Sequence, residues 1–293
     1  MLDSLGLSSA QFELLKTITK QLSETPGIVA IVLGGSYVRG TARPDSDLDI
    51  GIYYSEQSPP EIEAIRSFAG KVSIPDHLPT VTGFYEWGPW VNGGAWIQTV
   101  AGKVDLLYRN IEQVERVLNE SQTGIYHHHF YQQPTFGFVS VVYLAETKCC
   151  LPLFDRQHLL SEFKRRVEIY PRPLQERLIK DCLWMAEFAF IHAFGFAQRG
   201  DIFNTVGCLT RIAFMLAQAL FALNAEYYFG DKGCLEAIKQ FPRQPDQFSR
   251  RLEDVLALRM AKPAELESAV HQMQVLWKEV VDLTNLPVRN EEG

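Results

Sequence analysis

The segment that most constrains the fold of this chain is Ile31–Ile50, with the sequence IVLGGSYVRGTARPDSDLDI. It starts as an apolar run, turns at two glycines and a serine, and ends in a second apolar run that contains Asp47 and Asp49. In a β-strand, residues two apart point to the same face. The two carboxylates therefore project the same way from a segment that otherwise favours burial. Their repulsion makes burial costly unless a cation lies between them.

Length and charge limit the classes of protein to consider. The chain has 293 residues, enough for one large domain or two of ordinary size. Hydrophobic residues make up 46% of the chain, so it can form a sizeable core. Its formal net charge of -7 argues against a nonspecific nucleic-acid-binding protein, which usually carries an excess of basic residues. We therefore expect no nucleic-acid partner.

The distribution of apolar residues and cysteines predicts a cytoplasmic protein. The first ten residues lack the basic start and long apolar stretch of a signal peptide. The most apolar run, Leu209–Leu223, is interrupted by Arg211 and Gln218, so we expect no membrane-spanning segment. The five cysteines are scattered and odd in number, which favours reduced thiols over disulfides.

Hydrophobic periodicity and turn residues predict both helices and strands in the first half of the chain. A capping box at Ser8–Gln11 predicts the start of the first helix, and Pro26-Gly27 its end. Ala101-Gly102 has the right length for a tight hairpin. The predicted strands are Ile28–Leu33, Leu48–Tyr54, Val81–Tyr85, Ala95–Val100 and Lys103–Tyr108, and the further predicted helices are a short one after Gly34-Gly35-Ser36, Glu61–Gly70 and Ile111–Leu118.

After about Thr135 the strand signals end, and the pattern is typical of helices separated by proline and glycine. The predicted helices are Phe138–Thr147, Gln157–Glu168, Leu174–Gln198, Asp201–Ala225, Gly233–Gln240, Pro245–Met260 and Pro263–Leu283. We therefore expect an α+β fold. An α/β domain with a mixed sheet is predicted at residues 1–134, and an all-helical, bundle-like domain at residues 135–293.

The glycine turn and the acids together resemble a known signature. Gly35-Ser36, a ten-residue spacer and Asp47-Leu48-Asp49 resemble the motif of the polymerase-β-like nucleotidyltransferase superfamily. That superfamily carries a third carboxylate on a later strand, where this chain has Asp105 within an apolar run. The whole chain is similar to bacterial nucleotidyltransferase-like proteins and to kanamycin-type aminoglycoside nucleotidyltransferases, which have a helical carboxy-terminal domain.

The resemblance implies an enzyme that transfers a nucleoside monophosphate from a nucleoside triphosphate, expected to be ATP, to a hydroxyl of a small molecule or protein. Pyrophosphate is released. Asp47, Asp49 and Asp105 are then the catalytic residues and hold two Mg²⁺ ions, which prefer carboxylate oxygens. Gly35 lets the backbone approach a phosphate. Ser36, at a helix start, is expected to bind the β- and γ-phosphates.

Three basic residues are further candidates for nucleotide binding. Arg39 and Arg43 flank the motif, and arginine matches phosphate oxygens well, but solvated loop arginines are the alternative. In the kanamycin-type enzymes the helical domain closes over the nucleotide and supplies a lysine. The resemblance suggests this part for Lys232, for which an exposed loop lysine is the alternative.

Aromatic residues and histidines form two more notable groups. The segment Phe84–Trp90, followed by Trp96, either stacks a base or substrate ring or is a hydrophobic packing patch. Glu86 within it is a possible fourth acid. His127–His129 are consecutive, and consecutive side chains point in different directions, so we expect a loop lining the cleft rather than a metal site.

A hypothesis of another class stays open at this point. Nucleotidyltransferase-like domains also serve as antitoxin-like or regulatory nucleotide-binding modules that act through a protein partner. Magnesium-dependent pyrophosphate release would indicate the enzyme, whereas tight binding to a helical partner without turnover would indicate the module. The sequence leaves the acceptor, the preferred base and the oligomeric state open.

Overall fold

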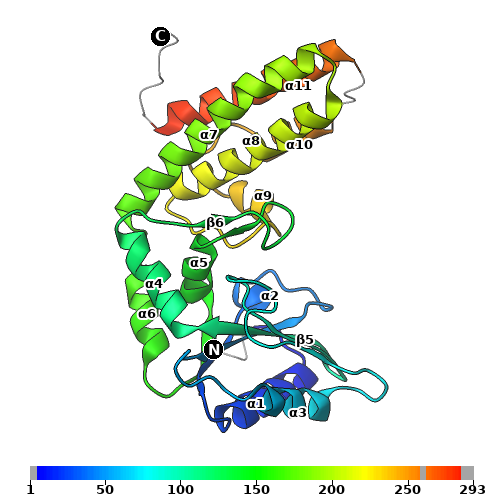
Figure 1. Cartoon of the computed structure of the whole chain (residues 1–293), viewed down its shortest axis with the longest axis vertical. Coiled ribbons are helices and arrows are strands. Elements are labelled where there is room, and N and C mark those ends of the chain that lie inside the picture. The colour runs from blue at the N-terminus through cyan, green and yellow to red at the C-terminus, as the bar shows by residue number, and fades with distance from the viewer. Residues whose placement is uncertain (1–4, 258–261, 285–293) are drawn as a thin grey trace. The chain divides into compact units, whose positions relative to one another are not determined.

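The computed structural model describes residues 5–257 and 262–284, and its contacts divide the chain into two compact units (Figure 1). The first unit comprises Met1–Glu120 and His127–Ile169, and the second comprises Ser121–Tyr126 and Tyr170–Gly293. The first unit contains a six-stranded sheet with helices, and the second is helical over its described residues. The predicted α+β fold class, with a mixed sheet followed by a helical region, is confirmed.

The sheet of the first unit has the strand order β3-β4-β5-β2-β1-β8. Only β2 and β5 in this sheet are parallel, and the other neighbours are antiparallel. The strands are β1 (Ile28–Leu33), β2 (Leu48–Tyr54), β3 (Thr80–Val81), β4 (Gly94–Thr99), β5 (Gly102–Asn110) and β8 (Leu151–Asp155). The parallel pair places β2 and β5 at the centre of the sheet, where their matching positions lie side by side.

One face of this sheet forms the hydrophobic core with α1 (Ser9–Ser23) and α3 (Ile62–Val72), which lie next to each other (Figure 1). Alternate residues of the central strands point into this core, among them Leu48 and Ile50 of β2 and Leu106 of β5. Intervening residues therefore lie on the opposite face. The acids of the signature belong to that second face.

The start of α1 confirms the predicted capping box. The Ser8 hydroxyl accepts a hydrogen bond from the Gln11 N–H, and the Gln11 side-chain oxygen accepts one from the Ser8 N–H. These two bonds satisfy backbone donors that a helix start otherwise leaves without partners.

Two predictions of secondary structure in the first unit are wrong. The predicted strand Val81–Tyr85 is reduced to β3, because the backbone after it makes turns, such as the hydrogen bond from Trp87 N–H to the Asn92 carbonyl. Strands also continue after Thr135. The edge strand β8 pairs with β1, and its Pro152 is tolerated because an edge strand needs fewer backbone donors.

The remaining elements of the first unit lie between or after the strands of the sheet, and the last two residues of α4 belong to the second unit. A two-stranded ladder joins β6 to β7. The elements are α2 (Gly35–Val38), α4 (Ile111–Gln122), β6 (His128–His129), β7 (Phe138–Val139), α5 (Val141–Cys149) and α6 (Leu159–Val167). Because β8 pairs with β1, the segment before Tyr170 belongs to the first unit. The compact units thus divide the chain later than the predicted boundary between residues 134 and 135.

The second unit contains long helices that pack side by side. Its elements are α7 (Arg172–Gln198), α8 (Ile202–Leu223), α9 (Cys234–Ile238), α10 (Phe248–Leu256) and α11 (Pro263–Thr284). α8 packs against α7 and α11 (Figure 1). The helix predicted at Pro245–Met260 corresponds to α10, and its last three residues lie outside the described residues.

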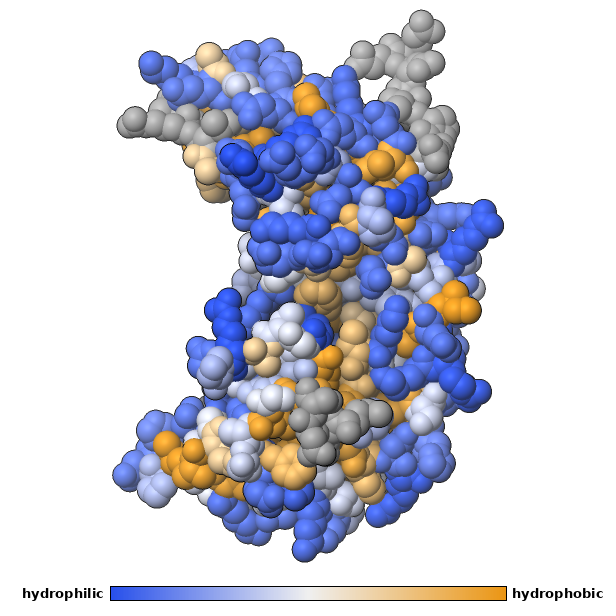
Figure 2. Space-filling view, turned by 180° about the vertical axis from the view of Figure 1, so that it is seen from behind, coloured by the Kyte–Doolittle hydropathy of each residue, from blue (hydrophilic) through white to orange (hydrophobic). Residues whose placement is uncertain are grey.

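Helix α8 is the most apolar element and is long enough to cross a membrane by length and composition. Its most apolar window has a mean hydropathy of 1.8, and 72% of that window is buried inside the protein. Such burial is typical of the core helix of a soluble protein. The molecular face seen in Figure 2 is mainly hydrophilic, with hydrophobic residues distributed among polar ones.

We expect the substitution S8A to destabilise the first unit by about 1 kcal/mol, because it removes the capping hydroxyl of α1. Urea unfolding followed by circular dichroism measures the effect. The matched control is S9A, which changes an exposed serine one residue later within the helix. An equal unfolding midpoint for S8A and S9A would contradict a stabilising role of the cap.

Candidate active site

The three acids of the signature come from two adjacent strands. Asp49 of β2 and Asp105 of β5 are partners in the parallel register, so they occupy neighbouring positions across the sheet. Asp47 lies two residues before Asp49, in the loop that leads directly into the same strand. All three lie on the face away from α1 and α3, because the intervening Leu48 and its neighbours fill the core. The structure therefore brings together the acids that the sequence selected.

A lysine joins two of these acids. The Lys103 ammonium lies 2.9 Å from an Asp47 carboxylate oxygen and 3.1 Å from an Asp105 carboxylate oxygen. Lys103 and Asp105 are two residues apart in β5 and therefore share a face. The sequence interpretation missed this lysine, although the alternation that selected the acids also placed it beside them.

Burial and neighbouring charges perturb the Asp49 carboxyl. Its pKa is raised to about 6, mainly by burial, then by the negative charges of Asp105, Asp47 and Glu146, while the guanidinium of Arg39 opposes the rise. A carboxylate in this position is costly to ionise without an added cation. The site is therefore electrostatically prepared to receive positive charge next to Asp49.

The glycine turn lies directly against Asp49. The Gly34 N–H donates a hydrogen bond of 2.8 Å to the Asp49 carbonyl. Gly35 has a φ of +65°, and a Cβ at this position would lie 1.7 Å from an Asp49 carboxylate oxygen. Only glycine fits here, because both the backbone conformation and the space exclude a side chain. The predicted approach of Gly35 to a phosphate stays a prediction.

The other predicted nucleotide-binding residues lie in different surroundings. Arg39 donates a hydrogen bond from Nε to the Gly35 carbonyl at 3.2 Å, which holds it near the turn. Ser36 is half-buried in α2, and Arg43 is exposed in the loop before Asp47. Lys232 is exposed before α9, in the second unit. Their contacts with a nucleotide stay predictions.

An ion pair between a buried arginine and a half-buried glutamate lies on the same face, further along the strands. Arg109 of β5 is 5% exposed and contacts both carboxylate oxygens of Glu146 in α5, at 2.7 and 2.8 Å. This pair ties α5 to the sheet, and the Glu146 charge also raises the Asp49 pKa. The sequence interpretation missed Glu146, because its arginine partner is 37 residues away and no local pattern links them.

A tryptophan extends the row of acids across a third strand. Trp96 of β4 is the register partner of Asp105, so Asp49, Asp105 and Trp96 occupy matching positions on β2, β5 and β4. Trp96 is 47% exposed, and its ring stacks on that of Trp87 with 4.8 Å between ring centroids. Direct partners in an antiparallel pair share a face. An exposed aromatic surface therefore borders the acids.

The remaining polar candidates serve local structure. The Glu86 carboxylate accepts a hydrogen bond of 2.8 Å from the Gly83 N–H within a turn. His127 contacts Glu120 at 2.8 Å, whereas His128 contacts the Phe136 carbonyl at 2.6 Å. Neighbouring histidines thus have different partners, as their sequence predicts.

The fit of a divalent metal depends on the acids and Lys103 together. Within residues 5–257 and 262–284, no group of three or more His, Cys, Asp or Glu side chains is arranged to hold a metal ion. Asp47 and Asp105 nevertheless both contact a single ammonium, so their oxygens already converge on one positive charge. An all-carboxylate set of donors suits Mg²⁺ or Mn²⁺. The ligand chemistry therefore fits these metals, and the position between two of the acids is taken by Lys103.

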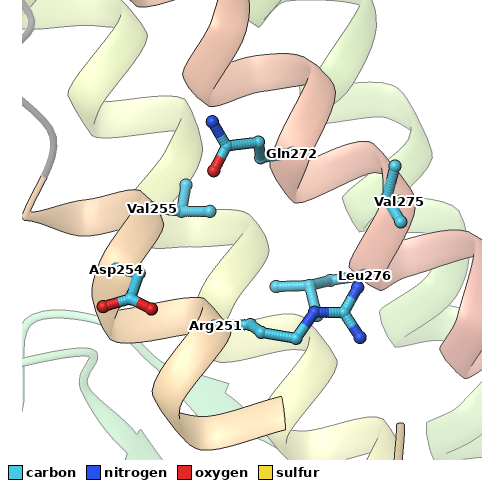
Figure 3. A pocket seen from close by; sticks show the side chains of 6 residues that line it. All are labelled: Arg251, Asp254, Val255, Gln272, Val275 and Leu276. Carbon is cyan, nitrogen blue, oxygen red and sulfur yellow. The ribbon is translucent and has the colours of Figure 1, made fainter. Parts of the chain in front are cut away.

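A cavity of about 200 Å³ lies elsewhere, between α10 and α11 of the second unit (Figure 3). It is lined by Arg251, Asp254 and Val255 of α10 and by Gln272, Val275 and Leu276 of α11. None of the predicted site residues lines it. The Arg251 guanidinium there contacts Glu279 at 2.6 Å, which is a link between the two helices.

Comparison with known proteins supports the family assignment of the amino-terminal part. Residues 13–81 match the family model of the nucleotidyltransferase domain. This segment contains the glycine turn, Asp47 and Asp49, so the superfamily expected from them is confirmed for this part of the chain. No curated protein sequence matches the chain.

Comparison with solved structures finds a nucleotidyltransferase-like protein from Exiguobacterium sibiricum 255-15, with a TM-score of 0.47 and 12% sequence identity. The alignment covers 92% of this chain and 76% of that one. An aminoglycoside 6-adenyltransferase from Bacillus subtilis has a TM-score of 0.35 and 12% identity, over 97% of this chain and 94% of that one. Similarity at this level carries no activity from those proteins to this chain.

We expect G35A to displace the Asp49 side chain, because its Cβ has no space beside that carboxylate. The positive φ alone should cost about 1–2 kcal/mol. The matched control is G40A, whose φ of +69° gives the same backbone strain with no atom near the new Cβ. Urea unfolding should show a larger loss for G35A than for G40A. Equal losses would mean that contact with Asp49 has no energetic effect.

Ionisation of Asp49 should destabilise the folded chain. The pKa of Asp49 is raised from 3.8 to about 6 in the folded chain. The protonated carboxyl therefore contributes to folding stability fully below pH 3.8, and this contribution is lost as the pH rises through about 6. D49N cannot ionise, so in metal-free buffer it should melt at a higher temperature than the wild type at neutral pH. The difference should shrink as the pH falls toward 3.8. Melting curves over this range test the idea, with D45N in the exposed loop as the control.

Proposed function

We propose that this chain, whose residues 13–81 match the nucleotidyltransferase domain, transfers a nucleoside monophosphate from a nucleoside triphosphate to a hydroxyl. The observation that carries the proposal is the row of acids beside the glycine turn. Asp49 and Asp105 are register partners on parallel strands, Asp47 lies two residues away, and Gly35 packs on the Asp49 carboxylate. These features combine concentrated negative charge with a close approach of the backbone.

The reaction forms one bond and breaks another. The acceptor oxygen attacks the α-phosphorus, the bond from that phosphorus to the pyrophosphate oxygen breaks, and pyrophosphate leaves with the bonding electrons. The hydroxyl proton passes to a carboxylate, for which we propose Asp105. Catalysis of this kind depends mostly on position and on the stabilisation of charge. Asp47 and Asp49, with Gly35, Ser36, Arg39 and Arg43, are proposed to bind the triphosphate side.

Two Mg²⁺ ions are proposed as cofactors, held by Asp47, Asp49 and Asp105. Bound there, they would neutralise phosphate charge and lower the pKa of the acceptor hydroxyl. The raised Asp49 pKa supports the proposal, because a carboxylate that is costly to ionise alone becomes favourable next to a cation. ATP as the preferred triphosphate, and the contribution of Lys232, belong to the same proposal.

The acceptor is proposed to be a small molecule or a protein side chain on the side of Trp96. Trp96 is exposed and lies in β4, next to Asp105 of β5. β4 is separated from β2 and the glycine turn by β5. Such a surface favours acceptors with a ring or another flat apolar face next to the hydroxyl. The net charge of -7 disfavours a nucleic-acid acceptor. A cytoplasmic location is proposed as well, supported by five free cysteines.

The direct test incubates the full chain with radiolabelled nucleoside triphosphates, Mg²⁺ and a pool of metabolites and proteins, and then identifies what becomes labelled. We expect a labelled product, pyrophosphate release that stops with EDTA, and a rate reduced by at least about 100-fold in D47N, in line with the loss of one main charge-stabilising group. D45N, an acid in the exposed loop, should keep the wild-type rate. D47N should keep the wild-type circular dichroism spectrum.

Two outcomes would contradict the proposal. Full activity in D47N would exclude a role of this acid in the reaction. Tight binding to a helical protein partner, with neither label transfer nor pyrophosphate release, would support the regulatory nucleotide-binding module instead.

A further inference from the structure

The strongest unexplained feature of the site is the position of Lys103. Its ammonium contacts Asp47 at 2.9 Å and both carboxylate oxygens of Asp105, at 3.1 and 3.3 Å. It therefore links the end of β2 to β5. The side chain is 42% exposed, so it reaches the acids from the solvent side rather than from the core.

The charges around it show why a cation is needed at this point. Asp49 and Asp105 are register partners on adjacent strands, and Asp47 lies two residues before Asp49, so three carboxylates are concentrated in one part of the sheet face. The nearby acid Glu146 has its own partner, Arg109, which is held in a two-point contact on the same face. Arg39 is held at the glycine turn through the Gly35 carbonyl. Lys103 contacts two acids of the signature directly.

The same carboxylate oxygens are the proposed ligands of a divalent metal. An ammonium and a metal ion cannot both occupy the space between Asp47 and Asp105, because each needs those oxygens and the two cations repel each other. A metal ion that binds there must therefore either break the contacts of Lys103 with Asp47 and Asp105 or bind despite repulsion from the Lys103 ammonium.

We propose that Lys103 is a built-in counter-ion that occupies the cation position between Asp47 and Asp105, and that a divalent metal binds there only by displacing its ammonium. This inference rests on the proposed function, since it concerns the same acids. The lysine acts as a positioning residue: it holds two mutually repelling carboxylates face to face before the metal arrives. Its presence also lowers the affinity for the metal alone.

The test measures binding of Mn²⁺ alone to the full chain by isothermal titration calorimetry or electron paramagnetic resonance. K103M removes the charge and keeps much of the side-chain volume, and it should bind Mn²⁺ about 10-fold more tightly than the wild type. K103R keeps a positive charge and should bind as the wild type does. K71M removes one lysine from an exposed position in α3 and controls for the change in net charge.

A second measurement separates this role from that of an ordinary surface ion pair. In EDTA, K103M should melt at a lower temperature than the wild type and K71M, because two carboxylates lose their common partner. Added Mn²⁺ should raise the melting temperature of K103M by more than that of the wild type, since a ligand that binds more tightly stabilises more. A structural ion pair would lower the melting temperature without changing the affinity for Mn²⁺.

The outcomes distinguish this inference from the proposed function. Tighter Mn²⁺ binding by K103M, with K103R and K71M unchanged, supports the counter-ion. Equal or weaker binding by K103M overturns the counter-ion while leaving a metal-dependent transferase in place. If no variant binds Mn²⁺, with or without a nucleoside triphosphate, both the counter-ion and the metal dependence of the proposed reaction are overturned.

Discussion

The repulsion between carboxylates on two adjacent parallel strands is the constraint on which the rest of the site depends. The register of β2 with β5 places Asp49 beside Asp105, and strand alternation adds Asp47 to the same face. Each neighbouring feature responds to this charge. Gly35 leaves space for the Asp49 carboxylate, and Lys103 bridges the other two acids. Arg109 holds the nearby Glu146. Such a concentration of negative charge on a partly open sheet face suits the proposed binding of divalent cations, which would neutralise the charge of a bound triphosphate.

Local patterns predicted those parts of the fold that local residues determine. β1 and β2 begin and end as predicted, because each is a short apolar run between turn residues. β8 escaped prediction because its sequence contains proline and its residues are all half-buried, so its strand conformation comes from pairing with β1. The aromatic run after Val81 was predicted as strand, but its backbone N–H groups bond to residues three to seven positions away, in turns.

The site divides in the same way. The acids and the glycine turn were predictable, because two-residue alternation and a short spacer are visible in one segment. Lys103 is predictable by the same alternation, because it lies two residues before Asp105 in β5. Glu146 was not predictable, since it depends on a contact that only the folded sheet creates. The register of Trp96 with Asp105 differs from the predicted hairpin, because the turn lies at Val100-Ala101, one residue earlier than predicted. Long-range pairing is therefore where the structure adds most to the function.

Asp49, Asp105 and Trp96 lie in register on successive strands, so the distances between them are set by the spacing of the strands. Neighbouring strands are spaced by about 4.8 Å, so the aromatic surface lies one strand from the proposed proton acceptor and two strands from the acid against the glycine turn. An acceptor that stacks on the tryptophan would present its reactive oxygen at a set reach from that surface. Acceptors would then be selected by the distance between their apolar face and their reactive hydroxyl. A sheet fixes the matching distance in the protein more rigidly than a loop does.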